Sequence, residues 1–159
     1  EVAKLEHKAI DLISRYGKNL VLDLASPYLV SDHEEIFHEA LPYARILFAS
    51  AEEYEALFRH PFDKDNPFGE YSNIEILALK LGEKGSYIAQ GNEVTFIPTI
   101  PVPKNRIVNT NGCGDSYAAG LMSCLLKGKD PVTAASYGTL LASRTLQQEE
   151  PFLKTHHPI

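Results

Sequence analysis

Two spacings of hydrophobic residues alternate along the chain, and together they predict helices and strands in turn. Apolar positions recur at helical spacing from Val2 to Tyr16, and Gly17 is expected to end that helix. Further helices are predicted over residues 33–41, 52–59, 117–126 and 131–146. Short apolar runs typical of buried strands occupy residues 19–24, 45–49 and 74–81. Because these elements alternate with short connections, a parallel sheet covered by helices is expected.

The pattern changes after residue 81. Residues 82–85 form a predicted turn, and the runs 87–90 and 94–97 flank a second turn at Gly91-Asn92. This section therefore predicts a hairpin added to the parallel strands. Residues 60–73, rich in Pro, Asp, Asn and Gly, are expected to form a loop.

Composition narrows the class of protein. The 159 residues suit one domain, and 44% apolar with 23% charged residues is ordinary for a soluble globular protein. A net charge of −6 without a Lys/Arg cluster argues against nucleic acid or a membrane surface as a partner. No apolar run reaches membrane-spanning length. The two cysteines, Cys113 and Cys124, lack ligand spacing and indicate reduced thiols inside a cell; the cytoplasm is the expected compartment, with an organelle left open.

The richest stretch for chemistry is the segment from Asn109 to Gly120, where an extended run meets a predicted helix. The two glycines at the junction, Gly112 and Gly114, allow a tight turn and a close approach of backbone to ligand. A helix start carries free N–H donors that favour an anion, and Asp115 adds a carboxylate beside them. Such a pair suits phosphoryl transfer to a hydroxyl, because one part neutralises the phosphate and the other takes the proton. The residues alone leave a second interpretation open, in which Asp115 only caps a helix.

This segment, Asn-Thr-Asn-Gly-Cys-Gly-Asp-Ser-Tyr-Ala-Ala-Gly, resembles the C-terminal signature of the PfkB (ribokinase-like) carbohydrate and nucleoside kinases. The resemblance implies that Gly112, Cys113 and Gly114 form an anion hole and that Asp115 is the catalytic base. Asn109 stands where the family most often has Asp, and Cys113 replaces a smaller residue. A cysteine beside a helix N-terminus is also a candidate for a lowered thiol pKa.

Three other stretches are similar to the same family. Residues 22–28 resemble a strand end of the adenosine-kinase branch, and residues 79–85 resemble a nucleotide-binding strand and turn. Glu53 matches the Glu of an Asn-x-x-Glu motif that orders Mg²⁺ through water, although Ser50 replaces the Asn. The resemblance implies nucleotide-binding roles for Lys80, Gly82, Gly85, Asn109, Thr110 and Asn111. Without the resemblance, Glu53 is expected to be a solvated surface carboxylate. Gly82 and Gly85 are then expected only to allow the turn and not to contact a nucleotide.

The resemblance implies the C-terminal half of a three-layer ribokinase-like α/β fold, with helices on both faces of the sheet. Residues 1–150 are expected to form this nucleotide-binding half and residues 151–159 a tail. ATP and Mg²⁺ are the implied cofactors, and a sugar or nucleoside is the implied substrate; a monovalent cation and a homodimer are left open. An N-terminal half of the same fold is expected as partner, and the fragment alone is expected to be inactive.

The expected function is therefore that of an ATP-dependent sugar or nucleoside kinase. The motif sequences are similar to those of the adenosine-kinase branch. The alternative is a kinase-like scaffold or regulatory subunit without turnover. Ser50, the departure from family pattern at residues 146–151 and the missing half favour the alternative. The intact run from Gly112 to Asp115 favours the enzyme.

Overall fold

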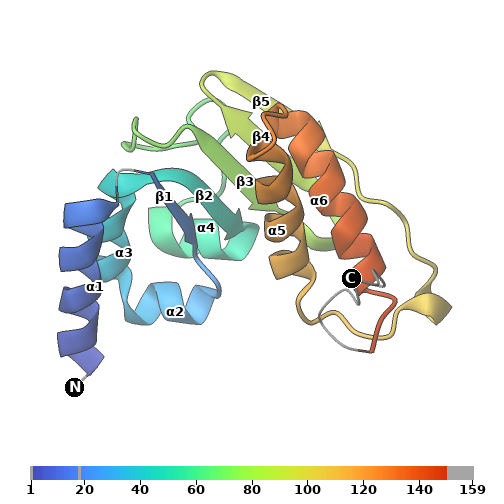
Figure 1. The fold of residues 1–159 in the computed structure, drawn as a ribbon, viewed down its shortest axis with the longest axis horizontal. Helices are drawn as coiled ribbons and strands as arrows, with labels where there is room; N and C mark the ends of the chain where they lie inside the picture. The colour runs from blue at the N-terminus through green and yellow to red at the C-terminus, as the bar shows by residue number, and fades with distance from the viewer. Residues whose placement is uncertain (1, 18, 150–159) are drawn as a thin grey trace. The chain divides into compact units, whose positions relative to one another are not determined.

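A computed structural model describes residues 2–17 and 19–149 (Figure 1). The chain divides into two compact units. The first comprises the described residues up to 82 together with 87–95, and the second comprises residues 83–86 together with those from 96 to 149. The tail predicted at 151–159 lies outside the described residues. Among the described helices, none has the length and apolar content needed to cross a lipid bilayer.

The helices and strands follow the predicted order closely. The first unit holds α1 (Val2–Tyr16), β1 (Leu20–Asp23), α2 (Pro27–Asp32), α3 (Glu34–Ala40), β2 (Ala44–Ser50), α4 (Ala51–Phe58) and β3 (Ile76–Lys80). Strands β4 (Ser86–Gln90) and β5 (Glu93–Ile97) belong partly to each unit, and the second unit holds α5 (Cys113–Leu125) and α6 (Pro131–Thr145). Short 3-10 helices occupy Leu41–Tyr43, Gly82–Lys84 and Lys104–Arg106.

Two elements differ from the prediction. Helix α2 was not expected, yet Ser26 caps it by accepting a hydrogen bond from the Leu29 N–H, and Pro27 occupies its first position. Ser followed by Pro is a common way to start a helix, so the sequence carried a signal for α2. Helix α5 begins at Cys113 rather than near Tyr117, because Gly112 supplies the turn that starts it.

The strands form one sheet in the order β1-β2-β3-β4-β5. The first three strands are parallel: Asp23 is paired with Phe48, and Ser50 with Lys80. Only a short link joins β3 to its neighbour β4, which requires an antiparallel pair. The sheet is therefore mixed, as the expected parallel strands with an added hairpin require (Figure 1).

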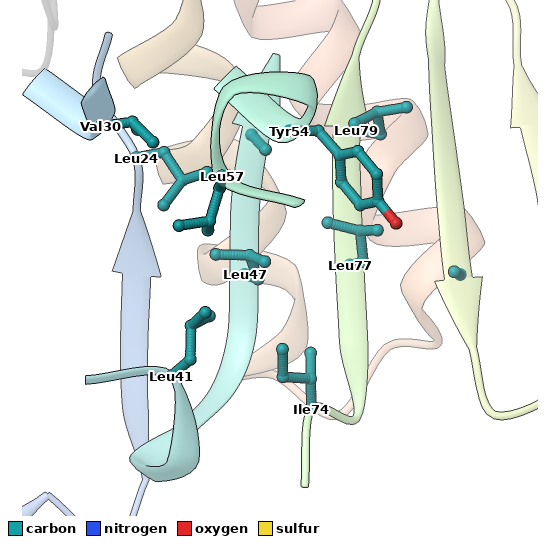
Figure 2. Close-up of a cluster of buried hydrophobic side chains, with 11 residues drawn as sticks. Leu24, Val30, Leu41, Leu47, Tyr54, Leu57, Ile74, Leu77 and Leu79 are labelled. Atoms are coloured by element: carbon teal, nitrogen blue, oxygen red, sulfur yellow. The ribbon is translucent and has the colours of Figure 1, made fainter. Parts of the chain in front are cut away.

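The core of the first unit lies between the sheet and α4 (Figure 2). Leu47 on β2 and Leu77 and Leu79 on β3 point to the same side and are almost fully buried, together with Tyr54 and Leu57 of α4. Burying each such side chain stabilises the fold by about 1.5–3 kcal/mol. The Tyr54 hydroxyl donates to the Pro67 carbonyl, so the predicted loop 60–73 is anchored to this core.

Helices α5 and α6 of the second unit approach each other at two glycines. A Cβ on Gly138 would lie 2.6 Å from the Tyr117 carbonyl oxygen, and one on Gly120 would lie 2.9 Å from the Gly138 Cα. Neither helix has room for a methyl group at these points. The close contact fixes α5, and therefore the glycine-rich segment that precedes it.

We expect Gly138→Ala to destabilise the full-length protein by about 1–3 kcal/mol, because the added methyl meets backbone atoms that have little freedom to move. Alanine is otherwise the better helix former by about 1 kcal/mol, so the sign of the effect tests the packing. Urea unfolding measures it. Ser136→Ala, at an exposed position of the same helix, is the control and should change stability little. A Gly138→Ala variant as stable as the wild type would contradict the close contact.

Candidate functional site

The glycine-rich segment leads directly into α5. Gly112 occupies the N-cap with φ 74°, a left-handed conformation that side chains other than glycine rarely adopt. The Cys113 N–H donates to the Thr110 carbonyl at 3.4 Å, and the Ser116 N–H donates to the Gly112 carbonyl at 2.9 Å. The N–H groups of Gly114 and Asp115 donate to no other described residue. These two donors, at the positive end of a helix dipole, are available to an anion.

The Asp115 side chain is exposed and lies within the first turn of α5. Its carboxylate forms no hydrogen bond or ion pair with another residue of the described chain. The N-cap position belongs to Gly112, and no side chain caps the helix. The interpretation of Asp115 as a helix cap is therefore wrong, and its carboxylate can face a ligand beside the two free donors.

The C-terminal end of α6 holds this segment on both sides. Before the glycines, the Val108 N–H donates to the Leu146 carbonyl at 2.8 Å. After them, the hydroxyl groups of Ser116 and the fully buried Thr145 are hydrogen-bonded at 2.7 Å. Asn109 also closes a local turn, because its Oδ1 accepts from the Asn111 N–H at 2.9 Å. Residues 146–151 depart from the family pattern, yet Leu146 at their start supports the glycine-rich segment through its hydrogen bond with Val108.

Cys113 differs from the expectation of a lowered thiol pKa. Burial raises the pKa of the Cys113 thiol, because an apolar environment disfavours the thiolate. The thiol is thus protonated at neutral pH, and the Cys113 N–H is engaged by the Thr110 carbonyl.

In the first unit, charged side chains gather where the parallel strands end. Asp23 is the last residue of β1 and Lys80 the last residue of β3, and the Lys80 ammonium lies 3.2 and 3.3 Å from the two carboxylate oxygens of Asp23. The Asp23 carboxylate also accepts from the N–H of Ala25, whose φ is 63°. Ligands of open α/β sheets bind at this carboxyl edge. Asp23 was not among the predicted site residues, although its place at the end of a predicted strand was a usable signal for this ion pair.

Glu53 lies beside that edge but is not the solvated carboxylate expected without the resemblance. It is 6% exposed and forms a capping box at the start of α4. Its Oε2 accepts from the Ser50 N–H at 2.6 Å, and the Ser50 hydroxyl accepts from the Glu53 N–H at 3.1 Å. Ser50, at the position of the family's Asn, is therefore the N-cap of α4.

The residues present fit a magnesium ion that keeps several of its waters. No group of three or more His, Cys, Asp or Glu side chains able to hold a metal occurs in the part of the chain that the structure describes. Mg²⁺ keeps several waters and is usually bound by one or two carboxylates and the phosphates of its substrate. The second carboxylate oxygen of Glu53, which the capping box leaves unused, is the group here that could order such water.

In the predicted turn at 82–85, one position accepts only glycine for a clear steric reason. Gly85 has φ 113°, and a Cβ there would lie 2.3 Å from the Ile97 carbonyl oxygen. Ser86 follows it and is hydrogen-bonded to Tyr117 of α5. Gly85, the segment 109–114 and Asp115 all belong to the second unit, whereas Lys80, Gly82 and Glu53 belong to the first. The hydrogen bond between Ser86 and Tyr117 was not predicted, since nothing in the sequence links two residues 31 positions apart.

Solved structures show the same fold. A probable sugar kinase protein from Rhizobium etli superposes with a TM-score of 0.78 at 22% identity, over 98% of this chain and 47% of that one. Adenosine kinase from Schistosoma mansoni, in complex with 2-fluoroadenosine, gives a TM-score of 0.77 at 19% identity, over 94% of this chain and 48% of that one. At these identities the likeness concerns the fold alone, and it confirms the expected ribokinase-like α/β architecture.

Two other relatives share more of the sequence. Adenosine kinase of Saccharomyces cerevisiae is 30% identical over 149 residues, which cover 85% of this chain and 43% of that protein. The 5-dehydro-2-deoxygluconokinase of Geobacillus kaustophilus is 31% identical over 171 residues, covering 93% of this chain and 50% of that protein. The chain thus spans about half the length of these relatives. The sequence profile of the pfkB family carbohydrate kinases matches residues 3–155. The glycine-rich segment, the mixed sheet and this match lead to one conclusion: the chain belongs to the pfkB family of carbohydrate kinases.

Proposed function

We propose that the protein to which this chain belongs transfers the γ-phosphoryl group of ATP to a hydroxyl of a sugar or a nucleoside. The observation that carries the proposal is the first turn of α5. There the free N–H groups of Gly114 and Asp115 and the unengaged Asp115 carboxylate lie within two consecutive residues. Family membership supports the class of reaction, and relatives named adenosine kinase and 5-dehydro-2-deoxygluconokinase support the two acceptor classes.

In the proposed mechanism, the amides at the start of α5 hold the negative charge of the phosphoryl group during transfer. Such preorganised donors stabilise charge without having to reorient during the reaction. Asp115 accepts the proton of the acceptor hydroxyl, which makes the oxygen a better nucleophile. Magnesium, when bound with ATP, neutralises phosphate charge, and Glu53 would order a water of its shell.

Lys80 is proposed to attract the phosphates of the nucleotide from the end of β3. Its side chain is only 19% exposed and its ammonium is paired with Asp23, so its position is set before a ligand arrives. Gly82, Gly85, Asn109, Thr110 and Asn111 are proposed to contact the nucleotide through the two loops that they form. The acceptor-binding residues are expected in the part of the relatives' length that this chain does not span, so residues 1–159 alone should turn over no substrate.

The alternative of an inactive scaffold is less favoured. The feature that a kinase requires most, an uncapped carboxylate beside free amides, is intact here. Ser50, which had favoured the scaffold, performs at the start of α4 a capping role that the family's Asn could also perform.

We expect Asp115→Asn in the full-length protein to lower kcat by about 10²–10⁴-fold, because an amide cannot accept the proton. ATP affinity should stay the same or rise slightly, since a negative charge beside the phosphate is removed. Steady-state kinetics and calorimetric titration with ATP separate the two effects. Glu55→Gln, which removes an exposed carboxylate from α4, is the control and should leave kcat unchanged. A near-normal kcat in Asp115→Asn would remove the proposed base.

Gly112→Val should instead weaken ATP binding by at least about tenfold, because a β-branched side chain disfavours the left-handed conformation that aims the amides. Gly128→Val is a matched control. Gly128 has nearly the same φ, 72° against 74°, and no atom lies near its missing Cβ. Both variants carry similar backbone strain, but only Gly112→Val should change the dissociation constant measured by calorimetry. Equal losses of affinity in the two would mean that strain alone is responsible.

A further inference from the structure

A buried pair of hydroxyl groups joins the start of β4 to the start of α5. The Ser86 Oγ and the Tyr117 Oη lie 2.9 Å apart, and the two residues are only 2% and 5% exposed. Both belong to the second unit. Either hydroxyl can donate in this bond, and burial raises the pKa of Tyr117 to about 12, so the phenol remains protonated.

Each partner is fixed by its own surroundings. Ser86 follows Gly85, whose backbone lies so close to the Ile97 carbonyl that no side chain fits between them. Tyr117 lies two residues after Asp115, and its carbonyl oxygen is packed against Gly138 of α6. The hydrogen bond therefore connects two backbone segments that have little freedom of their own.

These two segments carry proposed nucleotide contacts. Gly85 belongs to the turn before β4, and Gly112 to Asp115 form the anion site before and within the first turn of α5. A group that ties one segment to the other sets the distance between their contacts. A tie of this kind matters when one ligand has to reach both segments.

We propose that Ser86 and Tyr117 are positioning residues for a nucleoside triphosphate, holding the Gly85 turn and the Gly112–Asp115 anion site at the separation that this ligand spans. The inference rests on the proposed function and names the pair that prearranges its nucleotide site. Neither hydroxyl is assigned contact with the ligand. Both act through the backbone that they hold.

The test uses three variants of the full-length protein: Tyr117→Phe, Ser86→Ala and the double variant. Removing one hydroxyl leaves the other buried without a partner, which lowers stability, whereas removing both leaves no unpaired group. The double variant should therefore be more stable than the sum of the two single effects predicts. If the bond positions the nucleotide site, the double variant still lacks the tie and should bind ATP as weakly as the single variants.

We expect the dissociation constant of a non-hydrolysable ATP analogue, measured by calorimetry, to rise about 3- to 10-fold in all three variants. The KM for the acceptor at saturating ATP should not change. Thr139→Val is the control, because it removes a buried hydroxyl of α6 that bonds only the Ala135 carbonyl. It should lower stability without changing the dissociation constant.

Two results would overturn the inference: unchanged nucleotide affinity in the three variants, or an affinity that recovers with stability in the double variant. The second would mean that the bond stabilises the fold and positions nothing. Wild-type turnover is measured in parallel. If the wild type binds the analogue without turnover, the proposed function fails while the affinities still test the pair. If the wild type does not bind the analogue at all, both proposals fail.

Discussion

The close approach of α5 and α6 is the constraint on which the candidate anion site depends. At Gly120 and Gly138 the two helices leave no space for a side chain. Because α6 is this close, its C-terminal end reaches the segment before α5, where Leu146 accepts from Val108, and the first turn of α5, where Thr145 bonds Ser116. The loop is thus held at both ends by one helix. Preorganised donors are effective in catalysis because they need not move during the reaction.

The way in which α5 is capped explains why the Asp115 carboxylate is free of hydrogen bonds within the described chain. Aspartate near a helix start often accepts backbone N–H bonds, which would occupy its oxygens. Here Gly112, which has no side chain that could accept a hydrogen bond, occupies the N-cap. The N–H groups of Gly114 and Asp115 and the Asp115 carboxylate therefore form no hydrogen bond with another described residue. At α4 the opposite holds. Ser50 and Glu53 satisfy each other in a capping box, and this leaves one carboxylate oxygen at most for a metal's water.

At the carboxyl edge of the first unit, an ion pair plays a comparable part. Asp23 and Lys80 end two strands that both flank β2, and parallel pairing places their side chains on the same edge. The ion pair with Asp23 holds the ammonium of the partly buried Lys80 side chain in place. A lysine held in a fixed position can attract phosphate, although the negative charge of Asp23 weakens that attraction.

The order of the helices and strands other than α2, the glycine-rich segment with Asp115, and the resemblance to the family could all be predicted from the sequence. These follow from local periodicity and from residues close together in the chain, such as Gly112 and Asp115. The sequence also held signals that were passed over, in Ser26-Pro27 for α2 and in Asp23 at a strand end. Ser50 and Glu53 likewise match the sequence pattern of a capping box. The burial of Glu53, the raised pKa of the buried Cys113 thiol and the contact between Ser86 and Tyr117 emerged only from the three-dimensional packing. Burial and contacts between distant residues depend on how the chain packs, and local sequence patterns do not encode that packing.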